Sequence, residues 1–116
     1  MAFEVVRSLD SNRDLRLIIR HLIDSYVNLG DALPDAIDRA LARARIIEAE
    51  TDAIALSPHQ GTLLPHLRPG LRSVTKDRAI FYFDVDDAAQ KVRILAIFFG
   101  GQDHSQHILK RLRRVE

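Results

Sequence analysis

The sequence has 116 residues, of which 47% are apolar, 28% charged and 6% aromatic, and its 17 basic residues nearly balance 16 acidic ones. This length predicts one domain over residues 1–116, because a chain of this size supports a single hydrophobic core. The longest apolar run, residues 94–99, is far shorter than the roughly 20 residues that cross a bilayer. The absence of cysteine excludes disulfides and thiolate chemistry. With no membrane segment and no secretory leader pattern, we expect a cytoplasmic protein.

The first element in chain order is predicted to be a strand, which leads into a helix. Phe3–Arg7 is short, contains two valines and suits a strand. Apolar residues then recur at helical spacing from about Ser11 to Leu29. Ser11 and Asp14 resemble a capping box at the start of this helix, and Gly30 suits the left-handed residue that follows its end.

A second helix is expected to begin near Pro34, whose fixed φ suits a first helical turn, and to end before Ser57. Its predicted apolar stripe contains Ile37, Ala40, Leu41, Ala44, Ile47 and Ile54. The small alanines allow a close neighbour, and only a few residues separate the two helices. This pattern predicts an antiparallel helical hairpin.

The second half of the chain changes to the period of two that is typical of strands. Residues 58–70 are predicted to be an irregular loop, because they contain three prolines and two glycines. The expected strands are Leu71–Lys76, Ala79–Val85 and Lys91–Phe99, separated by turns at Asp77 and at Asp86 and Asp87. A short amphipathic segment, His104–Arg114, follows them. The predicted fold is therefore α+β, with an N-terminal strand, an α-helical hairpin, a three-stranded antiparallel meander and a short C-terminal helix.

This order of elements, together with particular residues, resembles the RelE/ParE superfamily of bacterial toxins from type II toxin–antitoxin systems. The matching stretches are Gly61–Thr62, Pro69–Arg72, Asp77–Phe83 and Val92–Phe99 leading into Gln102–His104. The resemblance covers nearly the whole chain. It implies a toxin that a small cognate antitoxin neutralises, with roles in growth arrest and plasmid stabilisation.

Two branches of this superfamily act differently. RelE-like members cut messenger RNA on the ribosome, whereas ParE-like members poison DNA gyrase. RNA cleavage without a metal needs cations and groups that transfer protons. By resemblance to the RelE branch, Arg72 or Lys76 together with Arg78 would supply the cations, and His104 or His107 would transfer protons.

The RelE pattern is incomplete, because Gly100, Gly101 and Gln102 stand where that branch has an arginine, and His107 and Ile108 stand near its expected tyrosine. This departure favours the ParE branch, whose members inhibit gyrase by binding and need no catalytic residues. The ribosome-dependent endoribonuclease remains the alternative. A third interpretation is an inactive member that only binds an antitoxin.

The resemblance also implies an antitoxin interface. A ParD-like or similar antitoxin would lay apolar anchors along the two helices and place acidic side chains against basic residues of the toxin. The candidate contact residues are Leu22, Tyr26, Ile37, Leu41, Arg68, Arg72 and Arg78. We expect no cofactor and no metal, because Asp103, His104 and His107 lie close together in the sequence without a distant third ligand.

Overall fold

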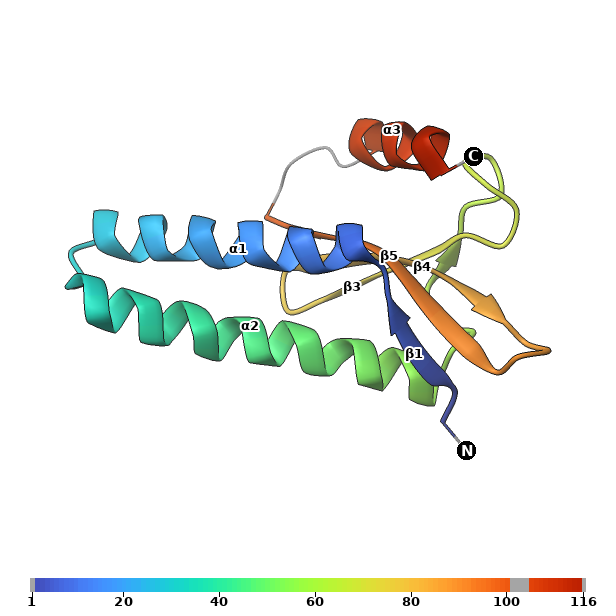
Figure 1. The fold of residues 1–116 in the computed structure, drawn as a ribbon, viewed down its shortest axis with the longest axis horizontal. Coiled ribbons are helices and arrows are strands. Elements are labelled where there is room, and N and C mark those ends of the chain that lie inside the picture. Colours follow the sequence, from blue (N-terminus) through green and yellow to red (C-terminus); the bar gives the residue numbers. More distant parts are fainter. Residues whose placement is uncertain (1, 101–104, 116) are drawn as a thin grey trace.

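The computed structural model describes residues 2–100 and 105–115, without the side chains of residues 105, 106, 114 and 115. Its elements follow in this order: β1 (Glu4–Arg7), α1 (Leu9–Asn28), α2 (Leu33–Leu56), β2 (Thr62–Leu63), β3 (Arg72–Lys76), β4 (Ala79–Asp86), β5 (Lys91–Phe99) and α3 (Ser105–Val115). The predicted α+β fold is confirmed, with the N-terminal strand, the helical hairpin, the antiparallel strands and the C-terminal helix in the expected order (Figure 1).

Helix α1 begins two residues earlier than the sequence suggested. Its N-cap is Ser8, whose Oγ accepts a hydrogen bond from the amide of Ser11 at 3.0 Å. Ser11 is therefore inside the first turn, and the proposed capping box of Ser11 and Asp14 is wrong because the side chain of Asp14 bonds elsewhere. The end of the helix is as predicted, since Gly30 follows the C-cap residue with φ of 110°.

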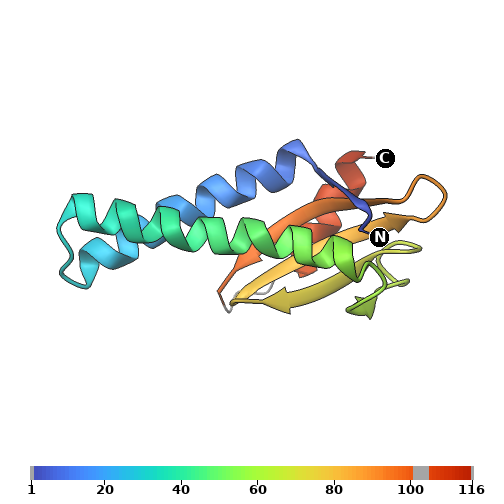
Figure 2. The same ribbon diagram turned by 90° about the horizontal axis from the view of Figure 1, so that it is seen from below.

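The two helices form the predicted hairpin, which extends well beyond the sheet (Figures 1 and 2). In the first half of α2, the buried line toward the core runs through alanines, with Ala36 and Ala40 at 0% exposure. Ile37 and Leu41 lie beside this line and are half-buried and 38% exposed, respectively. The sequence assigned both to the buried stripe, but the alanines occupy it because they let α1 approach closely.

The sheet has five strands in the order β1-β5-β4-β3-β2. The predicted meander forms its centre, and β4 pairs with both β3 and β5 in antiparallel fashion. β1 adds to β5 in parallel, with Glu4 opposite Lys91. β2 pairs with β3 inside the segment predicted as loop. It escaped prediction because it has only two residues, both exposed, and so leaves no hydrophobic pattern.

The sheet carries apolar side chains on both faces. The hairpin covers one face, where Phe81 and Phe83 of β4 pack with Ile47 and Ile54 of α2. The opposite face carries a smaller apolar cluster beneath α3. In Figure 2 the hairpin is nearest, the sheet lies behind it and α3 lies beyond the sheet. The described chain thus has three layers, with the sheet in the middle.

A tight turn joins β3 to β4, as predicted at Asp77. Lys76 pairs with Ala79, so only Asp77 and Arg78 lie between the strands. Both have left-handed backbones, with φ of 52° and 66°, which is the geometry of a type I′ hairpin turn. The side chain of Arg43 on α2 donates a hydrogen bond to the carbonyl of Asp77 at 2.7 Å, which attaches the β3–β4 turn to the helical hairpin.

Candidate functional site

Helix α3 lies across the face of the sheet that the hairpin leaves open (Figure 1). Ile108 and Leu112 are four residues apart and therefore share one side of the helix. They are buried against Leu71, Tyr82 and Ala96, which belong to three different parts of the sheet region. The apolar side of this amphipathic helix thus completes the smaller apolar cluster on the open face of the sheet.

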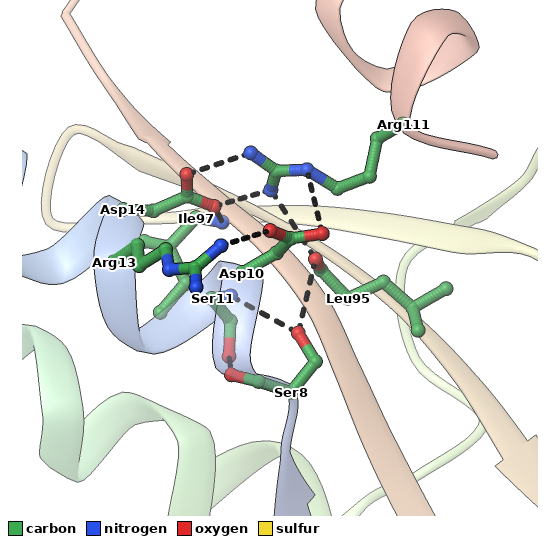
Figure 3. A network of polar contacts seen from close by, with 8 residues as sticks. All are labelled: Ser8, Asp10, Ser11, Arg13, Asp14, Leu95, Ile97 and Arg111. Carbon is green, nitrogen blue, oxygen red and sulfur yellow. Dashed lines mark hydrogen bonds and ion pairs between the residues drawn. The ribbon is translucent and has the colours of Figure 1, made fainter. Parts of the chain in front are cut away.

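A buried ion pair holds α3 at the start of α1 (Figure 3). The guanidinium of Arg111 donates to both carboxylate oxygens of Asp14, from Nη1 to Oδ2 at 2.5 Å and from Nη2 to Oδ1 at 2.9 Å. The two side chains are only 14% and 5% exposed. Bidentate pairs of this kind are among the stronger polar contacts in proteins. We call Asp14 and Arg111 the α1–α3 clamp.

An irregularity in β5 brings the sheet into the same network. Tyr82 pairs with Ala96 and Phe83 with Ile94, so Leu95 has no partner on β4 and forms a bulge. The amide of Ile97 donates to Asp14 Oδ2 at 2.9 Å. The carbonyl of Leu95 accepts hydrogen bonds from Ser8 Oγ and from Arg111 Nη1, both at 3.3 Å. The bulge therefore releases backbone groups that the clamp and the N-cap of α1 satisfy.

The electrostatics of the clamp favour the charged form of Arg111. Its pKa is raised above the ordinary value, first by the hydrogen bonds to Asp14 and also by the charges of Asp14 and Asp10, against the opposing effect of burial. Asp10 Oδ2 lies 3.7 Å from Arg111 Nε. The guanidinium therefore stays ionised at every physiological pH.

The sequence contains one signal for this clamp, the position of Asp14 on the buried face of α1. Ser11, Asp14, Ile18 and Leu22 lie on one helical face and are all buried. A carboxylate on an otherwise apolar face needs a partner, because burying an unpaired charge is strongly unfavourable. The spacing of residues along the chain could not show which arginine is that partner, because Arg111 lies 97 residues away.

The structure separates Arg72 and Lys76 from His107, one of the two histidines that the nuclease interpretation offers. Arg72, Val74 and Lys76 are two residues apart on β3, so their side chains lie on the same face of the sheet. Val74 packs into the core under the helical hairpin, and Arg72 and Lys76 therefore lie on that face. Lys76 Nζ is 3.9 Å from a carboxylate oxygen of Glu50 on α2. His107 lies on α3 beyond the opposite face. The sheet therefore stands between the two cations and this histidine, while His104 lies outside the described residues.

The other basic candidates differ in whether their guanidinium groups already have hydrogen-bond or ion-pair partners within the chain. Arg72 donates to the carbonyl of His59 at 2.8 Å, so its guanidinium is already used. Arg68 lies 3.9 Å from Asp84, a buried carboxylate that also accepts a hydrogen bond from Arg93 at 2.7 Å. This bond to Asp84 is the main reason that the pKa of Arg93 is raised.

Arg78 is the exposed candidate, because it lies at the outer end of the β3–β4 turn. Its backbone carbonyl accepts a hydrogen bond from the amide of Gly100 at 3.3 Å. This bond ties the end of β5 to the turn, so the chain leaves the sheet beside Arg78.

The apolar antitoxin candidates also separate into two kinds. Leu22 is 6% exposed and belongs to the main core, so it offers no surface to a partner in this structure. Tyr26 is half-buried, and the guanidinium carbon of Arg39 lies 4.0 Å from the centre of its ring. Ile37 is half-buried and Leu41 is 38% exposed, so both reach the surface of α2.

The outer face of α1 carries a basic surface that the sequence analysis did not single out. Arg13, Arg16 and Arg20 surround the exposed Leu17 and line a shallow hollow of about 510 Å³. Leu17 is 61% exposed. The helical spacing of these arginines was visible in the sequence, but their charges cancel against acidic residues of the same segment.

No three histidine or acidic side chains in the described part of the chain gather closely enough to hold a metal ion. No helix within residues 2–100 and 105–115 is both long and apolar enough to span a membrane.

Comparison with known proteins places the fold. No family model and no curated protein sequence matches the chain. A chain of the chromosomal ParDE TA system from P. aeruginosa matches with a TM-score of 0.64 and 22% identity, over 86% of this chain and 98% of its own. A chain of the toxin–antitoxin complex RelBE2 from Mycobacterium tuberculosis has a TM-score of 0.54 and 14% identity, over 86% and 100%.

A third similar structure is a double mutant of the E. coli toxin RelE in the free state, with a TM-score of 0.61 and 12% identity over 100% of both chains. These likenesses define the class of fold as that of the RelE and ParE toxins. The match to RelE includes α3 as well as the sheet and the helical hairpin.

Proposed function

We propose that this chain is the toxin of a type II toxin–antitoxin system and that it inhibits DNA gyrase by binding, in the manner of the ParE branch. Its fold is shared with chains of two toxin–antitoxin complexes and with a free toxin. The highest TM-score among these three belongs to the ParDE structure, which supports the ParE branch. A cognate antitoxin of the ParD type is the proposed neutralising partner.

One observation carries the choice of mechanism. A metal-independent ribonuclease must hold its cations and its proton-transfer group within hydrogen-bonding reach of a single phosphate. Arg72 and Lys76 lie on the hairpin face of the sheet, and His107 lies on α3 beyond the other face. An inhibitor that acts by protein contact does not need these side chains to converge, so this arrangement supports the binding mechanism.

The antitoxin would use the accessible part of the predicted interface. Ile37 and Leu41 offer apolar contacts on α2, and Arg78 offers a charge at the end of the sheet. Arg68 and Arg72 already bond within the chain, and Leu22 is in the core. The proposed contacts therefore follow the hairpin and end at the β3–β4 turn.

A supercoiling assay tests the proposal. Purified toxin is added to DNA gyrase, ATP and relaxed plasmid, with and without the antitoxin. We expect inhibition or accumulated cleaved DNA, reversed by the antitoxin. The variants Arg78→Ala and His107→Ala should still inhibit, because binding to gyrase requires no proton transfer. Undisturbed supercoiling by a toxin that arrests growth would overturn the gyrase mechanism.

The second candidate is a RelE-like, ribosome-dependent endoribonuclease, which is favoured by the match to free RelE over the full length of both chains. In that case, primer extension on messenger RNA from induced cells would reveal new cleavage sites at ribosome-bound codons. Arg78→Ala would remove them. If induction without antitoxin causes no growth arrest at all, the chain is an inactive member, and both mechanisms are wrong.

A further inference from the structure

Helix α2 has a second apolar side, which faces away from the core. Ala42, Ile46, Ala49, Ala53 and Leu56 make up what we call the outer stripe of α2. Ile46 is 46% and Leu56 70% exposed, so both belong to the exposed large apolar residues of the described chain. In Figure 2, α2 is the nearest element along most of its length. The outer stripe is therefore open to a partner.

The core does not account for this stripe. The residues with which α2 packs into the protein are a different set, namely Ala36, Ala40, Ala44, Ile47, Thr51, Ile54 and Ala55. An ordinary surface helix is apolar on one side and polar on the other. Helix α1 is closer to this rule, because arginines surround the exposed Leu17 in the middle of its outer face, and its other exposed large apolar residues, Leu9 and Val27, lie near its two ends. A helix with two apolar sides is expected to be covered on both.

The spacing of the outer stripe is that of a helix-pairing seam. Its members follow one another at intervals of four, three, four and three residues, which is the heptad pattern of positions that meet another helix. The alanines permit a short distance between helix axes. Ile46 and Leu56 supply the larger side chains. The pattern covers only two heptads, but α2 is already folded by the rest of the chain and needs no partner to form.

The charges beside the stripe indicate what kind of helix fits there. Arg45 and Asp52 flank it on the same side, seven residues apart. If two copies of α2 pair in antiparallel orientation with Ile46 opposite Ala49 of the other copy, Arg45 of each copy lies beside Asp52 of the other. Arg45 is exposed. The side chain of Asp52 is 72% exposed and lies 3.4 Å from Arg7 Nη2 of its own chain, so it can accept a second basic partner from the solvent side. A two-fold axis therefore creates two reciprocal ion pairs from one sequence.

The other flank is compatible with this arrangement. Arg43 and Glu50 occupy it and already have partners within the chain, the carbonyl of Asp77 at 2.7 Å and Lys76 at 3.9 Å. Their charges are opposite, so in the antiparallel pair each would again face its complement. Parallel pairing would bring Arg45 only toward Glu50, and Asp52 would meet no basic side chain of the other copy. The antiparallel orientation therefore satisfies more of the charges.

We propose that the outer stripe of α2 is a self-association surface, at which two copies of this chain pair through antiparallel α2 helices with Arg45 of each copy against Asp52 of the other. The stripe extends over 15 residues from Ala42 to Leu56, a length of about 21 Å. A contact of this size is at the low end for specific interfaces, so the dimer forms and dissociates with protein concentration. The proposal is independent of the toxin's target.

Sedimentation velocity over about a hundredfold range of concentration tests the pairing. The mass is expected to rise from the 13.2 kDa of one chain toward twice that value. Ile46→Glu should keep the chain monomeric, whereas the matched control Leu17→Glu, on the exposed face of α1, should dimerise normally. Arg45→Asp alone and Asp52→Arg alone should each weaken the dimer at least tenfold. The double charge exchange Arg45→Asp/Asp52→Arg should restore it.

Orientation is tested by cross-linking, which is simple because the natural chain has no cysteine. A mixture of Ala42→Cys and Ala53→Cys chains should form a mixed disulfide dimer, while Ala42→Cys alone should not. Cross-linking of Ala42→Cys to itself would instead indicate parallel helices and overturn the proposed arrangement. A chain that stays monomeric at every concentration, or whose Ile46→Glu variant loses only antitoxin binding, would show that copies of this chain do not pair there.

Discussion

Replacing Asp14 with alanine removes the acceptor on which three parts of the fold converge. The carboxylate accepts two hydrogen bonds from Arg111 of α3 and one from the amide of Ile97 in β5. Among the described hydrogen bonds, no other side chain accepts from both the β5 backbone beside the bulge and Arg111 of α3. The variant therefore leaves one buried guanidinium and one buried amide without their main partner.

The expected loss can be worked out from these two groups. Leaving the Ile97 amide unpaired costs about 1–3 kcal/mol. Breaking a fully buried ion pair costs about 3–5 kcal/mol. Arg111 loses less than this because its side chain is 14% exposed and Asp10 lies 3.7 Å from Nε, so it keeps part of its solvation and one counter-ion. We expect a combined loss of about 3–4 kcal/mol in the free energy of unfolding.

Urea unfolding followed by circular dichroism measures this loss. With a slope near 1.5 kcal/mol per molar urea, the midpoint should fall by about 2 M or slightly more. Asp24→Ala is the matched control, because Asp24 is an exposed carboxylate on the same helix. It should change the stability by less than about 0.5 kcal/mol. Hydrogen exchange should show faster exchange of the Ile97 amide in the Asp14 variant alone.

The reasoning fails if Asp14→Ala and Asp24→Ala unfold at the same urea concentration. It also fails if the Ile97 amide keeps its protection, because the side chain of Asp14 would then not be its acceptor in solution. Arg111→Met distinguishes the two halves of the argument. It removes the guanidinium but leaves the bond from Ile97 to Asp14, so it should destabilise the fold while the Ile97 amide stays protected.

Three further predictions concern other contacts. Arg78→Gly should raise the free energy of unfolding by about 1 kcal/mol in thermal melts, because Arg78 has φ of 66° and glycine adopts that backbone without strain; a loss would mean that the side chain stabilises the turn. Thr51→Val should lower stability by about 1–2 kcal/mol in urea, since it removes the acceptor of the Arg7 guanidinium at 2.6 and 3.1 Å; an unchanged midpoint would refute this. Gly61→Ala would place a Cβ 2.3 Å from the carbonyl oxygen of Ser73, so amide exchange in β2 should accelerate, and unaltered exchange would show that β2 tolerates the side chain.

Local patterns in the sequence were sufficient for most elements. The apolar positions of α1, the left-handed Gly30 and the turn at Asp77 each depend on the conformational preferences of a few neighbouring residues. β5 was predicted with its true bounds because its apolar run is continuous. β2 could not be predicted in this way, since a two-residue strand exists only through its pairing with β3.

The site residues show the same division. The sequence located Arg78 at a turn and His107 on a C-terminal helix, and the structure agrees with both positions. It could not show that Arg72 and Lys76 lie on the other face of the sheet from α3. That separation follows from the register of β3 on β4 and from the docking of α3, which are long-range properties.

The sequence by itself determined which residues are apolar, which segments form the helices and the β3–β4 turn, and which class of fold accommodates them. These properties are local, because the period of the apolar residues and the backbone preferences of glycine and proline act over a few positions. Only the tertiary structure decided that Asp14 pairs with Arg111, that β1 joins β5 in parallel, and that α2 keeps an uncovered apolar side. Each of these depends on which surfaces, distant in the sequence, pack against each other and bury apolar area, and the spacing of residues along the chain does not determine that packing.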